Sequence, residues 1–246
     1  MRRWIWLFLS LVLACGGCGT VREAEPEQEP PPAVQTETPA QNTDAPPEDA
    51  PETEDHVLLT LNTEVNGGRV LTLEAIGKKR ADMDQWGVRE VRVYDGDTLI
   101  QTILAQEAID AGGMSGTVDD GYTDCWCVEE AAAVRDMNFD GYGDLDLFGW
   151  LCNNTIPHYY WLWDPAAEQY RYAFTLQGAE EDAEKEEIVS QYHASGIYYT
   201  DHYRYTAEEN LTLVQREVED YTRPIHDGEP TREVYNIIDG QLVLQE

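Results

Sequence analysis

Oxygen-bearing side chains recur through residues 136–144 at the spacing that a calcium-binding loop requires. Positions 1, 3, 5 and 9 of this loop carry Asp136, Asn138, Asp140 and Asp144, and position 6 is Gly141. Calcium takes about six to eight oxygen ligands, and a tight loop presents them from alternate residues. The glycine permits the sharp turn that directs the first three side chains toward one centre. The segment therefore predicts a calcium site.

The rest of the loop separates this site from the helix-loop-helix type. In the predicted arrangement Tyr142 contributes its backbone carbonyl, and Asp144 binds the ion directly or through water. Position 12 is Leu147, where a helix-loop-helix site carries a bidentate glutamate. The alternative interpretation is an acidic turn that joins two strands and binds no metal.

Three cysteines flank the loop, namely Cys125, Cys127 and Cys152. Cys125 and Cys127 are separated by one residue and lie on the same side of a strand, so they pair poorly with each other. In an oxidising compartment we expect one of them to bond to Cys152, which leaves one thiol free. A zinc site would need a fourth ligand, for which His158 is the nearby histidine, and we do not expect zinc.

Aromatic residues follow the loop, notably Trp150, Tyr160 and Trp161. Stacking on a ligand such as a sugar ring is one use of such a cluster, and packing of strand faces is the commoner one. The sequence has no glycine-rich phosphate loop, zinc-protease helix motif or nucleophile elbow. We therefore predict that the protein is not an enzyme, with a carbohydrate-binding or cell-wall-processing protein as the alternative.

Short strand patterns separated by turn residues must position the loop. Paired strands are expected at residues 57–62 with 69–74, 91–94 with 98–101, 159–163 with 170–174, 197–205 with 211–217, and 233–238 with 242–244. A further strand, 144–150, leaves the loop. Regular hairpins of this kind predict an all-β fold of antiparallel hairpins in a propeller-like or sandwich arrangement. Two short helical stretches are indicated, around residues 105–109 and 179–188, and the second is so rich in glutamate that we expect it to be a solvated excursion.

The first 19 residues predict a lipoprotein signal peptide rather than a part of the fold. Arg2 and Arg3 precede an apolar run, residues 4–14, which is too short to span a bilayer. The run ends in Val-Leu-Ala-Cys at Cys15, which resembles a bacterial lipobox whose cysteine carries acyl chains such as palmitate. Cys18 is a poorer candidate, and an ordinary signal peptide cut near Gly19 is the alternative. We expect a lipid anchor in the cell membrane or outer membrane, with the protein facing outside the cytoplasm.

Residues 20–55 are predicted to form a disordered tether. They hold eight of the twelve prolines and eleven acidic residues, with Arg22 as their one basic residue. Such a composition buries too little apolar surface to offset the entropy of ordering. The segment would lift the domain that follows, residues 56–246, away from the membrane.

That domain is strongly acidic, with 37 acidic and 13 basic side chains, in a chain of formal net charge −32. A nucleic-acid partner is excluded, because phosphate binding needs clustered lysine and arginine. The charge permits attraction of cations or of a basic protein partner, although a surface that merely stays soluble is the simpler interpretation.

The stretch from Val134 to Leu145, followed by Trp150, Asn153, Tyr160 and Trp161, resembles a known pattern. It is similar to the calcium-loop proteins of the bacterial envelope that include lysozyme-inhibitor immunity lipoproteins paired with type IV secretion effectors. It also resembles the single loops of FG-GAP and related propeller repeats. The resemblance covers a small part of the chain, and its metal-ligating residues match Asp136, Asn138, Asp140, Tyr142 and Asp144.

This resemblance implies a propeller-like fold in which one bound calcium stiffens a functional face. It assigns no inhibitory residue here. The sequence thus predicts a non-enzymatic, membrane-tethered calcium-binding protein that recognises another macromolecule, with a muramidase-type enzyme as the partner to test first. A purely structural lipoprotein, whose calcium site only stabilises the fold, is the remaining alternative.

Overall fold

The computed structural model describes residues 54–80, 84–112, 120–150, 156–206, 210–225 and 228–245. The predicted signal peptide with Cys15, the predicted tether up to residue 53, and Cys152 and Asn153 lie outside these residues. Within the described ranges, no helix is long and apolar enough to cross a membrane.

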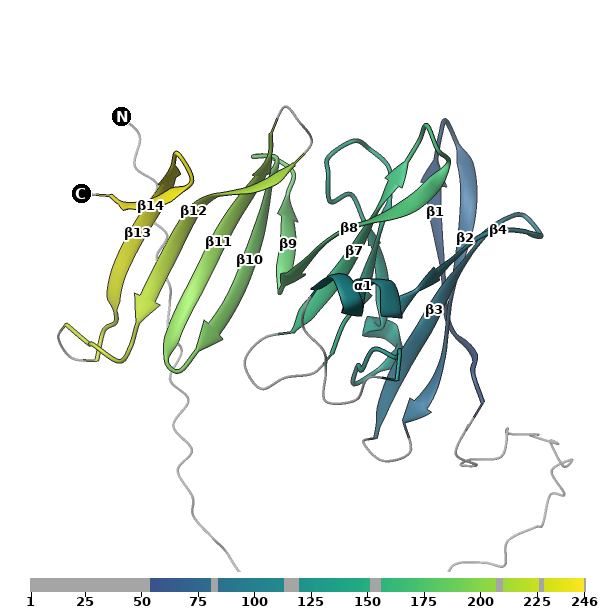
Figure 1. Cartoon of the computed structure of the whole chain (residues 1–246), viewed down its shortest axis with the longest axis horizontal. Helices are drawn as coiled ribbons and strands as arrows, with labels where there is room; N and C mark the ends of the chain where they lie inside the picture. Colours follow the sequence, from purple (N-terminus) through teal and green to yellow (C-terminus); the bar gives the residue numbers. More distant parts are fainter. Residues whose placement is uncertain are drawn as a thin grey trace, which may run out of the picture. The chain divides into compact units, whose positions relative to one another are not determined.

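The described chain is almost entirely β-structure (Figure 1). The strands are β1 (His56–Val65), β2 (Arg69–Arg80), β3 (Gln85–Asp95), β4 (Thr98–Leu104), β5 (Ala132–Arg135), β6 (Asp144–Phe148), β7 (Pro157–Asp164), β8 (Gln169–Gln177), β9 (Ala179–Asp182), β10 (Glu187–Ala194), β11 (Ile197–Tyr205), β12 (Leu211–Asp220), β13 (Thr231–Ile238) and β14 (Gln241–Leu244). Helix α1 (Ala105–Gly112) follows β4, and a short 3₁₀ turn, Val128–Glu130, precedes β5.

The strands form three antiparallel sheets in which each strand pairs with its neighbours in sequence. Sheet A contains β1–β4, sheet B contains β5–β8, and sheet C contains β9–β14. The predicted all-β fold of antiparallel hairpins is therefore confirmed. Local turn chemistry explains the hairpins: the three residues between β1 and β2, Asn66, Gly67 and Gly68, adopt positive φ of 39°, 77° and 101°, which asparagine and glycine tolerate best.

One of the two predicted helices is correct and the other is wrong. Residues 105–109 belong to α1, whereas residues 179–188 form β9 and the start of β10. Glutamates favour a helix only weakly, and pairing within sheet C outweighs that preference. Ala179 of β9 lies opposite Ser190 of β10, and both Ala179 and Ile188 are buried. The strand pairing therefore buries apolar residues at both ends of this segment.

Sheets A and B share the main hydrophobic core. Leu71, Leu73 and Val93 of sheet A pack in one cluster with Trp161 and Trp163 of sheet B, and all are at most 2% exposed. Because side chains alternate along a strand, the neighbouring residues of β7 point to the other side of sheet B. Sheets A and B thus form a sandwich, in agreement with one of the two predicted arrangements.

The other side of sheet B is buried as well. Tyr160 of β7 belongs to a second cluster with Ala179 and Ile188 of sheet C, and no described residue of sheet A or α1 contributes to it. Further members pack around these residues from both sheets, namely Leu162, Phe174, Leu176, Tyr203, Tyr205 and Leu211. Strand β6 is accordingly buried at every position, so sheet B is the layer that both other sheets contact.

A close approach of two backbones shapes sheet A. A Cβ atom placed on Gly77 would lie 1.9 Å from the carbonyl oxygen of Gly87, at a register shift between β2 and β3. Only glycine avoids this overlap without moving a strand.

We expect Gly77→Ala to lower the free energy of unfolding by about 2 kcal/mol or more, because the added methyl group forces the two strands apart. Denaturant unfolding of the full chain measures the change. Val70→Ala, which alters an exposed position of the same strand, is the control and should cost less than about 0.5 kcal/mol. Equal effects of the two substitutions would contradict the close-packing argument.

Candidate metal centre

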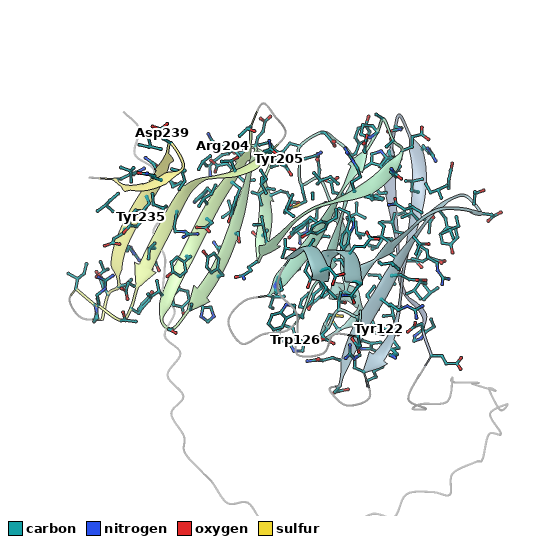
Figure 2. The ribbon with its side chains drawn as sticks, viewed as in Figure 1. Tyr122, Trp126, Arg204, Tyr205, Tyr235 and Asp239 are labelled. Atoms are coloured by element: carbon teal, nitrogen blue, oxygen red, sulfur yellow. The ribbon has the colours of Figure 1, made fainter. Side chains whose placement is uncertain are left out.

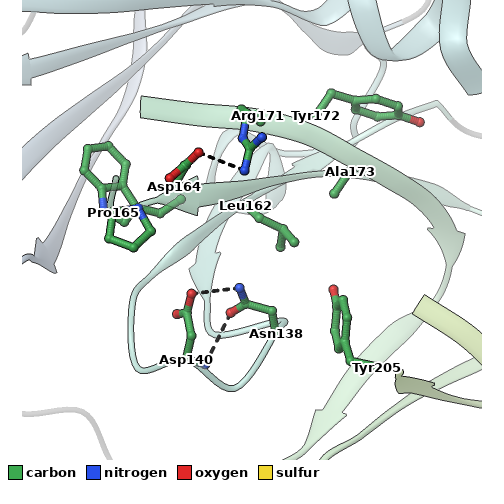
Figure 3. A pocket seen from close by; sticks show the side chains of 10 residues that line it. Asn138, Asp140, Leu162, Asp164, Pro165, Arg171, Tyr172, Ala173 and Tyr205 are labelled. Carbon is green, nitrogen blue, oxygen red and sulfur yellow. Dashed lines mark hydrogen bonds and ion pairs between the residues drawn. The ribbon is translucent and has the colours of Figure 1, made fainter. Parts of the chain in front are cut away.

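The predicted calcium loop connects β5 to β6, so antiparallel pairing holds both of its ends. Arg135, the last residue of β5, lies directly opposite Asp144, the first residue of β6. Residues 136–143 must therefore close a narrow loop. The sequence predicted a site here, and the structure brings Asp136, Asn138 and Asp140 into one hydrogen-bonded set. Figure 3 shows the part of this set that joins Asn138 to Asp140.

The side chains at loop positions 1, 3 and 5 organise the loop backbone. The Asp136 carboxylate accepts the backbone N–H groups of Asp140 and Gly141, at 3.1 and 3.0 Å. Asn138 Oδ1 accepts the Asp140 N–H at 3.3 Å, and Asp140 Oδ1 accepts the Tyr142 N–H at 2.9 Å. A carboxylate oxygen has more than one acceptor site. These bonds thus shape the loop and leave acceptor capacity for a cation.

Asp144, at position 9, is fully buried. Its two carboxylate oxygens accept backbone N–H groups from Met137 at 2.8 Å and from Trp163 at 2.9 Å. Burial raises the pKa of Asp144 to about 7; these two hydrogen bonds oppose the rise, and the charges of Asp140 and Asp136 add to it. The folded protein therefore disfavours the ionised form of Asp144 as long as no positive charge is close.

The lack of such a charge distinguishes Asp144 from the other buried acids. Five further carboxylates are buried, and each forms an ion pair with arginine: Glu90 with Arg92, Asp146 with Arg135, Glu187 with Arg204, Asp201 with Arg216, and Asp220 with Arg223. Asp136, Asp140 and Asp144 form no ion pair within the described part of the chain. The loop segment thus carries three carboxylates that form no ion pair with a described basic residue.

The side-chain atoms of the loop that could ligate a metal are all oxygen atoms, which suits a hard cation such as calcium. Among the described residues, no group of three or more histidine, cysteine or acidic side chains has the placement of a metal site. The amide oxygen of Asn138 and the backbone carbonyl of Tyr142 would therefore have to complete the donor set. Calcium stays a prediction for these five residues.

The loop also packs closely against its surroundings. A Cβ atom on Gly143 would lie 2.2 Å from Thr63 Oγ1 of β1 and 2.4 Å from Val134 Cγ1 of β5. The Gly143 carbonyl accepts the Tyr170 hydroxyl at 3.0 Å. This second glycine of the loop is therefore needed for space, whereas Gly141, with φ of 84°, is needed for the turn.

Loop positions 2 and 4 join sheet B to sheet C. Met137 is fully buried in the second hydrophobic cluster, and Phe139 packs against it. Phe139 has φ of 61°, a conformation that costs roughly 1–2 kcal/mol for a residue with a side chain. Contacts of its ring with the cluster offset this cost, so the loop has oxygen donors at odd positions and apolar anchors at positions 2 and 4.

A cavity of about 550 Å³ opens beside the loop (Figure 3). Residues of the loop, of the β7–β8 hairpin and of β11 line it, including Asn138, Asp140, Leu162, Arg171 and Tyr205. The buried Tyr205 hydroxyl finds no hydrogen-bond partner in the described ranges. Burial and the nearby charges of Asp144, Asp140 and Asp136 raise the pKa of Tyr205, so this hydroxyl stays protonated and is available as a donor.

The other predicted site residues do not join this centre. Cys125 is buried and Cys127 is partly exposed, and the two are not bonded to each other, whereas their predicted pairing with Cys152 falls outside the described residues. Desolvation raises the pKa of the Cys125 thiol to about 12. His158 Nδ1 lies 2.7 Å from Asp146 Oδ1, so the histidine that was weighed as a zinc ligand is bound to a carboxylate.

The predicted stacking residues lie inside the protein. Tyr160 and Trp161 are 0% and 1% exposed and belong to the second and the main cluster, respectively. Neither ring has a face open to a ligand, which argues against the stacking role. Trp150 is partly exposed, and its indole N–H has no partner within the described chain.

Sequence reasoning missed Phe139 and Tyr205. The signal for Phe139 was a bulky residue at a loop position that the turn places in a left-handed conformation. No local signal marked Tyr205, because it reaches the loop from β11 through the packing of sheet C on sheet B.

We expect Phe139→Gly to separate the predicted calcium binding of the loop from its packing against sheet C. Glycine removes the backbone strain but also the ring that anchors sheet C, so calcium binding should persist while the second cluster loosens. Hydrogen exchange of β10 and β11 should become at least tenfold faster, with little change in β2 and β3. Phe139→Leu, which keeps an apolar side chain, is the control. Unchanged exchange in β10 and β11 of the glycine variant would show that Phe139 does not anchor sheet C.

Comparisons with known proteins assign no family. No family model and no curated protein matches this chain. A crystal structure of a protein of unknown function from Bacteroides fragilis NCTC 9343 aligns with 76% of this chain and 89% of its own, at 6% identity and a TM-score of 0.26. That score is too low to carry an argument about fold or function.

Proposed function

We propose that this protein is a non-enzymatic, membrane-tethered lipoprotein that binds calcium at residues 136–144 and recognises another macromolecule. The lipid would be attached at Cys15, and the acidic tether would hold the domain outside the cytoplasmic membrane. A muramidase-type enzyme of the envelope is the first partner to test. The resemblance of the loop to calcium-loop envelope lipoproteins supports this choice.

The observation that carries the calcium proposal is the unpaired, fully buried carboxylate of Asp144 beside Asp136 and Asp140. A buried charge normally requires a partner of opposite charge, and the other buried acids of the described chain have arginine. A divalent cation would supply the missing charge here, held by Asp136, Asn138, Asp140, Asp144 and the Tyr142 carbonyl.

Calcium would act on recognition through the second cluster. Met137 and Phe139 lie between the calcium-binding side chains and bury themselves against sheet C. An ordered loop would therefore fix how sheet C packs on sheet B. A surface that is already ordered loses less entropy when a partner binds, so calcium would strengthen binding without touching the partner.

Calorimetric titration of calcium into the EDTA-treated full chain, with thermal unfolding, tests the site. We expect one bound ion. At a calcium concentration of one hundred times Kd, the free energy of unfolding should rise by about 2.7 kcal/mol, and the melting temperature by roughly 5–10 °C. Asp140→Asn keeps the size of the side chain and should weaken calcium binding at least tenfold.

The control is Asp97→Asn, which removes an equal charge from an exposed hairpin turn of sheet A. Asparagine is preferable to alanine in this test, because Asp136 and Asp140 also accept backbone N–H groups and truncation would disturb the loop without calcium. Identical titrations of both variants and the unchanged chain would reject residues 136–144 as the site.

A further inference from the structure

Sheet C has one face rich in tyrosine and aliphatic side chains. Directly opposite residues of antiparallel strands point to the same side of a sheet. Tyr192, Tyr199 and Val218 are opposite one another in one row across β10, β11 and β12. A second row runs through Asp201, Arg216, Tyr235 and Leu244, and Leu242 lies opposite Ile237 beyond it. We call the side of the sheet that carries these residues the tyrosine face; its members are Tyr192, Tyr199, Val218, Asp201, Arg216, Tyr235, Leu244, Ile237 and Leu242.

The protein covers only one end of this side of the sheet. Farther along the strands, Ile188 lies opposite Tyr203 and Leu211 lies opposite Tyr205, and all four residues belong to or pack against the second cluster. No residue of β13 or β14 belongs to either hydrophobic cluster of the described chain. Leu242 and Leu244 are 48% and 51% exposed, and Figure 2 labels Tyr235 in this part of sheet C, on β13. The tyrosine face therefore extends an internal packing surface outward.

The middle of the tyrosine face is held rigidly. Arg216 binds both carboxylate oxygens of Asp201 at 2.6 Å and donates to the Tyr192 hydroxyl at 3.0 Å. The rings of Tyr192 and Tyr199 stack with centroids 5.0 Å apart, and the Arg216 guanidinium lies 5.6 Å from the Tyr199 ring centre. Ordered tyrosines beside a fixed arginine are typical of binding hot spots, because little side-chain entropy remains to be lost.

Charge indicates the kind of partner. Residues 179–245 contain 16 acidic and 5 basic residues, and two of those bases, Arg216 and Arg223, are bound to buried aspartates. A second copy of the chain would bring two acidic sheets together, which costs free energy, whereas a basic surface would be attracted.

We propose that the tyrosine face is the surface with which this protein binds a basic protein that presents an apolar centre. This inference rests on the proposed recognition function and locates it on sheet C, away from the calcium-binding side chains.

The last strand provides a closely matched test. Leu244 lies on the tyrosine face opposite Tyr235, and its neighbour Val243 lies on the other face opposite Asn236. Both side chains are about half exposed, at 51% and 43%. Leu244→Lys and Val243→Lys therefore add the same charge at adjacent positions and at no cost in buried core.

The probe is lysozyme, a basic muramidase, whose binding to the immobilised full chain is measured in calcium and in EDTA. We expect the unchanged chain to bind lysozyme. Leu244→Lys should raise the Kd at least tenfold, and Val243→Lys should raise it less than threefold. Equal weakening by both variants would show that only net charge matters and would overturn the assignment of the face. Absence of binding by the unchanged chain would overturn the basic partner. Self-association that only Leu244→Lys abolishes would assign the face to a second copy instead.

The same data separate this inference from the calcium proposal. Selective loss with Leu244→Lys in both buffers, together with calcium titrations that show no bound ion, would retain the tyrosine face and reject the calcium site. Normal calcium titrations of both variants, with no difference in lysozyme binding, would reject the face and retain the site.

Discussion

The structure depends on a carboxyl group, that of Asp144, which is buried without a basic partner in the described part of the chain. Asp144 starts β6 at the centre of sheet B, and its two oxygens fix the backbone of Met137 on one side and of Trp163 on the other. These hydrogen bonds tie the loop to β7, the strand whose side chains enter both clusters. Removing the carboxyl group would leave two buried N–H groups unpaired, whereas keeping it ionised without a nearby positive charge costs free energy.

Sheet B transmits the state of the loop to both neighbouring sheets. Gly143 lies against Thr63 of sheet A, and Met137 and Phe139 lie against sheet C. Close-packed interiors transmit displacements, because no free volume absorbs them. A loop of eight residues between two short strands is thus in contact with all three sheets, which explains why a strained conformation at Phe139 is retained.

Local features of the sequence predict much of the fold. The Asn66–Gly67 turn and the alternation in β7 specify hairpins and strand faces by themselves. The alternation also separates Tyr160 from Trp161, but it cannot show that both faces of β7 are buried, since that depends on sheets far away in the sequence. The prediction of a helix at residues 179–188 is wrong for the same reason, because helix propensity is a local property. The pairing of β9 with β10, which packs Ala179 and Ile188 against sheet B, depends on distant parts of the chain.

The candidate site likewise has features that the local sequence predicts and features that depend on the packing of distant segments. Spacing alone places Asp136, Asn138 and Asp140 in one loop, because the three residues are close neighbours in the chain. The missing basic partner of Asp144, the contact of Phe139 with sheet C and the position of Tyr205 are properties of the packed protein. Arg216 is the partner of Asp201 within sheet C, whereas Asp144 forms no ion pair with an arginine of the described chain, so the two buried aspartates lie in different electrostatic surroundings. The chain itself provides the partner of Asp201, at 2.6 Å. If a cation from solution provides that of Asp144, as we propose, the packing of sheet C on sheet B depends on that cation.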